Sequence, residues 1–136
     1  MDKIRILVVD DERELAKAIQ IRLNVSGYEV LTASNGVEGV KLAQETTPKL
    51  ILLDVLMPEM DGLIALEKIK EDSRTKNIPV IILTAKSQSD DVSKAINLGA
   101  EDYIVKPFDY KVMLEKIKKA LGYNSLMKNQ KNCHFC

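Results

Sequence analysis

The chain has 136 residues, the length of one domain with a short extension. Its 20 Lys+Arg and 20 Asp+Glu give a formal net charge of zero, which excludes bulk charge as a reason to expect nucleic-acid or membrane-surface binding. With 46% hydrophobic and 29% charged residues, the composition is typical of a globular domain and excludes a disordered chain. No apolar run reaches the roughly 20 residues of a membrane helix, so we expect no membrane insertion.

Short apolar segments alternate with stretches in which apolar residues recur at helical spacing. In chain order, the segments predict strands over residues 4–9, 29–33, 50–53, 80–83 and 103–105, and the spacing predicts helices around 15–23, 37–43, 63–70, 92–98 and 112–121. The third and fourth strands are apolar without alternation, which indicates burial on both faces. Five repeats of strand and helix predict a parallel α/β domain with right-handed crossovers.

The periodic pattern stops at Gly122, so we assign residues 1–122 to one domain. Residues 123–136 are polar and too short for a second domain, and we predict a disordered tail. Both cysteines, Cys133 and Cys136, lie in this tail, and the simplest interpretation is a cytoplasmic protein without disulfides. A zinc site in the run Cys133-His134-Phe135-Cys136 is disfavoured, because structural zinc sites use four ligands, usually in two separated pairs.

Polar side chains stand at the ends of four predicted strands. The first strand ends in Asp10-Asp11-Glu12, the third in Asp54, the fourth in Thr84 and the fifth in Lys106. Ligands of open parallel sheets bind beyond the carboxyl ends of the strands, so we expect these groups to share one edge. One of them alone is best explained as a helix cap or a solvated loop residue, but the whole set is not.

Crowded carboxylates repel one another, and Mg²⁺ relieves the repulsion. One carboxylate can then act as a nucleophile toward phosphorus and form an acyl phosphate. The cation, the Lys106 ammonium and the Thr84 hydroxyl would neutralise the phosphoryl oxygens. Asp54 is the expected nucleophile because it ends a central, buried strand.

Four motifs resemble the receiver domains of bacterial two-component response regulators. They occupy residues 6–12, 52–62, 79–85 and 99–108, and the resemblance extends over about residues 3–121. It implies a flavodoxin-like fold, which is a doubly wound five-stranded parallel sheet with strand order 2-1-3-4-5 and helices on both faces.

The resemblance also implies residue roles. Asp54 would be the phosphoacceptor, Asp11 a direct Mg²⁺ ligand, Asp10 a ligand acting mostly through water, and the Leu56 carbonyl a further ligand. Lys106 would pair with a phosphoryl oxygen, with a cis peptide bond between Lys106 and Pro107. The implied switch residues are the Thr84 hydroxyl and the Tyr103 ring, although Tyr103 is also compatible with simple packing.

The implied function is a phosphorylation-activated signalling switch rather than an enzyme. A histidine kinase or a histidine phosphotransfer protein would donate the phosphoryl group, and the surface of the fourth helix, fifth strand and fifth helix would signal to an unknown downstream protein. We expect a monomer or weak dimer, because Val92 and Lys116 replace residues typical of the dimerising branch. We expect no nucleic-acid binding by this domain itself, and the alternative is a fragment of a longer regulator with a DNA-binding or enzymatic output domain.

Three other classes are disfavoured by particular residues. A flavodoxin-like cofactor binder needs a phosphate-cradling loop where this chain has Asp10-Asp11-Glu12. A Rossmann dehydrogenase needs Gly-x-Gly-x-x-Gly, which is absent. A haloacid-type phosphatase usually has a second Asp two residues after its nucleophile, where this chain has Leu56.

Overall fold

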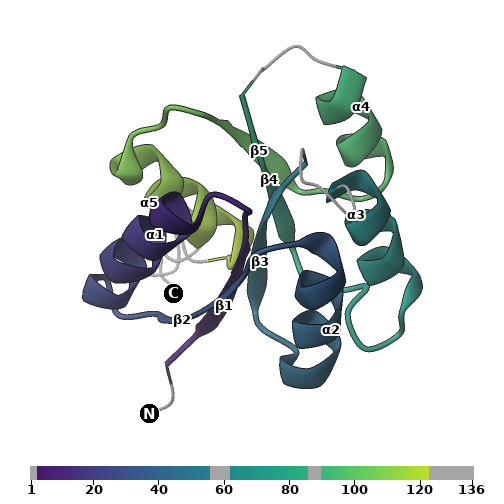
Figure 1. Ribbon diagram of the computed structural model, residues 1–136, viewed down its shortest axis with the longest axis horizontal. Helices are drawn as coiled ribbons and strands as arrows, with labels where there is room; N and C mark the ends of the chain where they lie inside the picture. The colour runs from purple at the N-terminus through teal and green to yellow at the C-terminus, as the bar shows by residue number, and fades with distance from the viewer. Residues whose placement is uncertain (1–2, 56–61, 86–89, 123–136) are drawn as a thin grey trace, which may run out of the picture.

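Five parallel strands form one sheet in the order β2-β1-β3-β4-β5 (Figure 1). The computed structural model describes residues 3–55, 62–85 and 90–122. The strands are β1 (Arg5–Val9), β2 (Glu29–Ala33), β3 (Leu50–Asp54), β4 (Val80–Thr84) and β5 (Asp102–Val105). The predicted parallel sheet and its strand order are therefore confirmed.

One helix follows each strand, and the helices cover both faces of the sheet. They are α1 (Arg13–Val25), α2 (Gly36–Thr46), α3 (Gly62–Glu71), α4 (Asp90–Asn97) and α5 (Tyr110–Ala120). In Figure 1, α1 and α5 lie on one side of the sheet, and α2, α3 and α4 lie on the other. None of the described helices combines the length and apolar character needed to cross a membrane.

The sheet separates two apolar cores. Successive residues of a strand point to opposite faces, so Leu7 and Val9 join the core beneath α2, α3 and α4, while Ile6 and Val8 join the core beneath α1 and α5. All five residues of β3 are buried, as the absence of alternation in its sequence predicts. A residue at the end of β3 is thus held from both sides.

Backbone hydrogen bonds join neighbouring strands just beyond the ends of β1 and β5. The Asp10 N–H donates to the Ala33 carbonyl over 3.0 Å, and the Lys106 N–H donates to the Thr84 carbonyl over 2.7 Å. These bonds extend the sheet by one residue on β1 and β5. They fix the backbone at the positions where the sequence places its polar side chains.

Helix α3 begins in direct contact with the end of β3. A Cβ atom added to Gly62 would clash with the Asp54 carbonyl oxygen and the Val55 Cα, and the Gly62 N–H donates to the Val55 carbonyl over 3.0 Å. Only a residue without a side chain fits this approach. Gly62 therefore fixes the backbone that carries Asp54.

Candidate functional site

Four of the predicted site residues lie at the carboxyl edge of the sheet. Asp10 directly follows β1, Asp54 and Thr84 are the last residues of β3 and β4, and Lys106 directly follows β5. Asp10, Asp54 and Thr84 are buried. The central strands β1, β3 and β4 thus deliver two carboxylates and a hydroxyl to one place.

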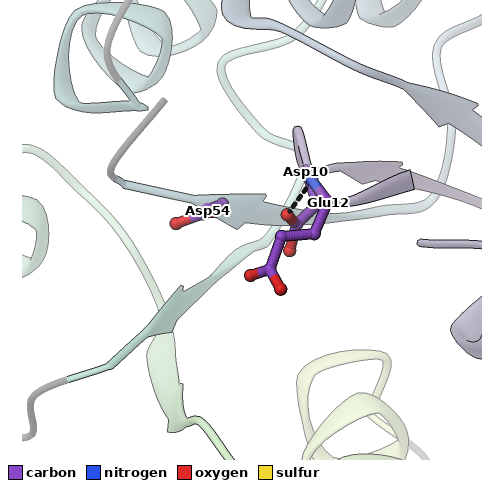
Figure 2. Close-up of side chains that lie close together, drawn as sticks. All are labelled: Asp10, Glu12 and Asp54. Atoms are coloured by element: carbon purple, nitrogen blue, oxygen red, sulfur yellow. Dashed lines mark hydrogen bonds between the residues drawn. The ribbon is translucent and has the colours of Figure 1, made fainter. Parts of the chain in front are cut away.

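Three acidic side chains form the centre of this edge. Asp10, Glu12 and Asp54 each offer a carboxylate oxygen, and these oxygens lie within 4.8 Å of one another (Figure 2). The Glu12 N–H also donates to Asp10 Oδ1 over 2.9 Å. Asp11 is exposed and is not a member of this trio among the described residues. Leu56 lies outside the described residues.

The Lys106 ammonium contacts all three carboxylates. Its Nζ lies 2.9 Å from Asp10 Oδ2, 3.0 Å from Glu12 Oε1 and 3.3 Å from Asp54 Oδ2. Only 15% of the lysine side chain is exposed. The trio therefore surrounds one largely buried cation, and three carboxylates against one ammonium leave an excess of negative charge.

The environment of Lys106 keeps its side chain protonated. Burial alone would lower its pKa, but hydrogen bonds to Asp10 and Glu12 and the charges of Asp10 and Asp54 raise the pKa above its usual value. The lysine accordingly provides a permanent positive charge beside Asp54 at neutral pH.

The donor set suits a hard divalent cation. Octahedral Mg²⁺ with bonds of ~2.1 Å needs ligand oxygens about 3–4.2 Å apart, and it prefers carboxylates and water. The trio oxygens lie within 4.8 Å of one another, so this edge gathers the kind of donor atom that Mg²⁺ prefers. The residual negative charge of the site favours such an ion.

Tyr103 lies in β5, next to the site rather than in it. It is half-buried against the core beneath α2, α3 and α4. Lys116 of α5 places its Nζ 5.0 Å from the centre of the Tyr103 ring, donates to the Tyr103 carbonyl over 2.6 Å and pairs with Asp102 over 3.1 Å. Tyr103 therefore couples the edge strand to α5.

A groove of about 450 Å³ opens beside Lys106. The peptide bond between Lys106 and Pro107 is cis. The charged lining residues of the groove are Glu12 and Lys106. The other walls are the apolar or aromatic side chains Leu15, Ala85, Pro107, Phe108 and Tyr110. A partly apolar groove between α1 and the segment that follows β5 thus borders the site at Glu12 and Lys106.

The profile of the response regulator receiver domain family matches residues 6–118. The chain belongs to this family. A receiver domain is a signalling module rather than a conventional enzyme. The family assignment therefore confirms the expectation, drawn from the sequence, that this chain is a signalling domain.

Individual relatives and solved structures agree with the family assignment. The chain is 38% identical over 117 residues to the DNA-binding dual master transcriptional regulator RpaA of Synechocystis, covering 86% of this chain and 48% of that protein. The chain thus spans about half the length of that relative. The crystal structure of a CheY-like receiver domain protein from Methanospirillum hungatei has a TM-score of 0.83 and 32% identity, covering 88% of this chain and 94% of that one.

A third similarity concerns the metal. The receiver domain of the sensor histidine kinase PA1611 from Pseudomonas aeruginosa carries a magnesium ion coordinated in its active-site cleft. This receiver resembles it with a TM-score of 0.83 and 27% identity, covering 89% of this chain and 99% of that one. The acidic trio is consistent with Mg²⁺ in this receiver too.

The sequence predicts that Glu12 lies at this edge, as part of the run Asp10-Asp11-Glu12, but the motifs assign it no role. The structure adds its place in the acidic trio and its contact with Lys106. The available signal was its place between β1 and α1, at the N-cap of α1, where Ser, Thr, Asp and Asn are the usual residues.

Proposed function

We propose that this receiver accepts a phosphoryl group on Asp54 in a Mg²⁺-dependent reaction and signals through the resulting aspartyl phosphate. The observation that carries the proposal is the position of the Asp54 carboxylate, which ends a fully buried central strand among two other carboxylates and the Lys106 ammonium. The Lys106 ammonium, together with a bound cation, would offset the negative charge that Asp54 gains when it is phosphorylated.

The chemical step is the formation of one bond and the breaking of another. An oxygen of the Asp54 carboxylate bonds to phosphorus while the bond from phosphorus to the leaving group breaks, and the leaving group keeps the electron pair. The leaving group is an imidazole nitrogen for a phosphohistidine donor and a carboxylate oxygen for a small acyl phosphate. Lys106 would hold one phosphoryl oxygen, and the Thr84 hydroxyl would donate to another.

Asp11 and Asp54, with the carbonyl of Leu56, are the proposed direct protein ligands of Mg²⁺, and Asp10 acts mainly through water. When bound, the cation neutralises charge on the phosphoryl oxygens. The high negative charge of the edge supports this assignment.

The proposed donor is a histidine kinase or a histidine phosphotransfer protein of the cytoplasm. The partly apolar groove beside Lys106 offers such a protein a contact surface next to Asp54. The proposed output is a change in the surface of α4, β5 and α5, read by a downstream protein while the receiver stays a monomer or weak dimer.

The test is mass spectrometry of the intact protein after incubation with Mg²⁺ and acetyl phosphate. The parent should gain one phosphoryl group that hydroxylamine removes, and peptide mapping should place it on Asp54. Asp54→Asn keeps the shape and hydrogen bonding of the side chain but lacks the nucleophilic oxygen, so it should gain none. Full labelling of the Asn variant would show that another residue is the acceptor.

A second arrangement is favoured by the lengths of the relatives. Because this chain covers only 48% of the regulator from Synechocystis, the receiver could serve as the input part of a longer regulator with a DNA-binding or enzymatic output. Sequencing the natural reading frame around the codon for Cys136 distinguishes the two arrangements.

A further inference from the structure

All three N–H donors of the Lys106 ammonium are engaged in this structure. It carries three N–H groups, and its Nζ contacts three carboxylates, those of Asp10, Glu12 and Asp54. Under the proposed function, the same ammonium must bind an oxygen of the phosphoryl group on Asp54. One of the present contacts therefore has to be given up.

The three contacts differ in how easily water can replace them. The Asp10 side chain is fully buried, and both of its oxygens are engaged, one by Lys106 and one by the Glu12 N–H. Breaking that contact would leave a buried carboxylate short of a partner, which is costly. Asp54 is the reacting group. The Glu12 side chain is 61% exposed, so water readily replaces Lys106 as its partner.

Glu12 has no competing structural task among the described residues. It is the N-cap residue of α1, yet its side chain makes no capping hydrogen bond to the helix. A shorter residue would cap the helix better. The length of Glu instead places Oε1 at 3.0 Å from Lys106 Nζ.

We propose that Glu12 is a positioning residue that holds Lys106 in a resting place and competes with the phosphoryl group for it. The inference rests on the proposed function of Asp54. In the resting state Glu12 draws the ammonium toward the N-terminus of α1, and during phosphorylation Lys106 leaves Glu12 while keeping Asp10. Glu12 therefore slows phosphorylation of Asp54.

Two variants separate the contact from the charge. Glu12→Gln keeps the length of the side chain and removes its charge, whereas Glu12→Asp keeps the charge and withdraws the carboxylate from Lys106. Glu14→Gln removes the same charge from a neighbouring exposed position of α1 and is the matched control. Partly exposed ion pairs are worth little, so we expect both Glu12 variants to be phosphorylated about two- to five-fold faster than the parent at saturating Mg²⁺. Glu14→Gln should match the parent.

Rates are measured with acetyl phosphate over a range of Mg²⁺ concentrations, which separates the limiting rate from the apparent Mg²⁺ affinity. A second readout needs no phosphorylation: the ¹³Cε resonance of Lys106 in the Mg²⁺-free protein should shift in both Glu12 variants and stay in place in Glu14→Gln.

The outcomes are distinct. Equal rates in all four proteins, or an unmoved Lys106 resonance, would overturn the inference. A slower Glu12→Gln variant whose rate is restored by more Mg²⁺ would also overturn it and make Glu12 a metal ligand. A parent that gains no phosphoryl group on Asp54 removes the proposed function and the inference with it, whereas labelled parent and variants with equal rates remove only the inference.

Discussion

Gly62 shows how one residue controls the position of the proposed nucleophile. The space where its side chain would be is filled by the backbone of Asp54 and Val55, and backbone cannot move aside as a side chain can. Gly39 of α2 is a useful contrast, because a Cβ there would lie 2.8 Å from the methyl groups of Val9, which are side-chain atoms.

We expect Gly62→Ala to lower the free energy of unfolding by about 1–3 kcal/mol, despite the higher helix propensity of alanine. Gly39→Ala should also be destabilising, because Val9 is buried and β-branched, but it should cost less than Gly62→Ala, because the atoms in contact belong to a side chain rather than to the backbone. Urea unfolding of both variants measures the difference, and phosphorylation of the folded Gly62→Ala protein should be slower because Asp54 is displaced. A Gly62→Ala variant as stable as Gly39→Ala would contradict the backbone contact.

Asp72, which lies outside the candidate site, should make the stability of the folded protein depend on pH. Hydrogen bonds from the side chain and the backbone N–H of Arg74 lower the pKa of Asp72 from 3.8 to about 2. A lowered pKa in the folded state stabilises the protein above the ordinary pKa, and this stabilisation is lost as the pH falls from about 4 toward 2.

Asp72→Asn should therefore be less stable than the parent at pH 6, and the difference should shrink as the pH falls below 4. Urea unfolding at several pH values measures this, and an NMR titration of the Asp72 carboxyl gives its pKa directly. In Arg74→Gln that pKa should return toward 3.8. A parent–variant difference that does not change with pH would rule out the assigned cause.

At the scale of elements, the proposed switch involves β4, α4 and β5. Thr84 ends β4, and its neighbour in the register is Val105 of β5, two residues beyond Tyr103. Movement of the Thr84 hydroxyl toward a phosphoryl group on Asp54 would change the space available between α4 and β5. The Tyr103 ring is the side chain proposed to respond.

A hydrogen bond to a charged group supplies about 1.5–3 kcal/mol, whereas moving an equilibrium from 1:99 to 99:1 takes about 5.5 kcal/mol. We therefore expect Thr84→Ala to be phosphorylated on Asp54 but to show a reduced, not abolished, conformational change. Amide NMR with and without beryllofluoride should show smaller shifts over residues 90–105 than in the parent. Thr32→Ala, on the exposed side of β2, is the control, and a full response in Thr84→Ala would remove its hydroxyl from the switch.

The elements that the sequence predicted best are those with strong periodic patterns. Uninterrupted apolar residues predict β3 and β4, and helical spacing predicts α1 up to Ser26-Gly27, where Gly27 has a φ of 101°. No periodic pattern predicts the segment between α3 and β4, because its conformation depends on single polar contacts. Thr75 is buried and donates to the Ile69 carbonyl over 2.6 Å, and Lys70 donates to the carbonyl groups of Lys76 and Ile78.

The candidate site also contains features that the sequence predicts and features that depend on single contacts. The rule that the carboxyl ends of parallel strands share one edge depends only on topology. It predicts that Asp10, Asp54, Thr84 and Lys106 lie at the same edge. The contact of Glu12 with Lys106 depends on the reach and rotamers of two long side chains that are 94 positions apart in the chain, and no periodic pattern encodes it.

For the whole molecule, Mg²⁺ binding and folding should be coupled. An ion that binds only the folded state stabilises it by about 2.7 kcal/mol at one hundred times the dissociation constant. Removing a direct carboxylate ligand weakens this effect.

We expect the thermal unfolding temperature of the parent to rise with MgCl₂ at constant ionic strength, and Asp11→Ala to need a higher concentration for the same rise. Without Mg²⁺, Asp11→Ala should be at least as stable as the parent, because one repelling carboxylate is gone. Differential scanning calorimetry measures both effects. An identical response of the two proteins to Mg²⁺ would show that Asp11 is not a ligand.

The division of the interior into two cores bears on how such a protein can change over evolution. Since Ile6 and Val8 face one core while Leu7 and Val9 face the other, a volume change on one side of the sheet need not be compensated on the opposite side. The helices of one face are therefore free to acquire new surfaces, and with them new partners, while the helices of the other face keep theirs. Both faces of the sheet share the strand ends that carry the proposed phosphorylation site.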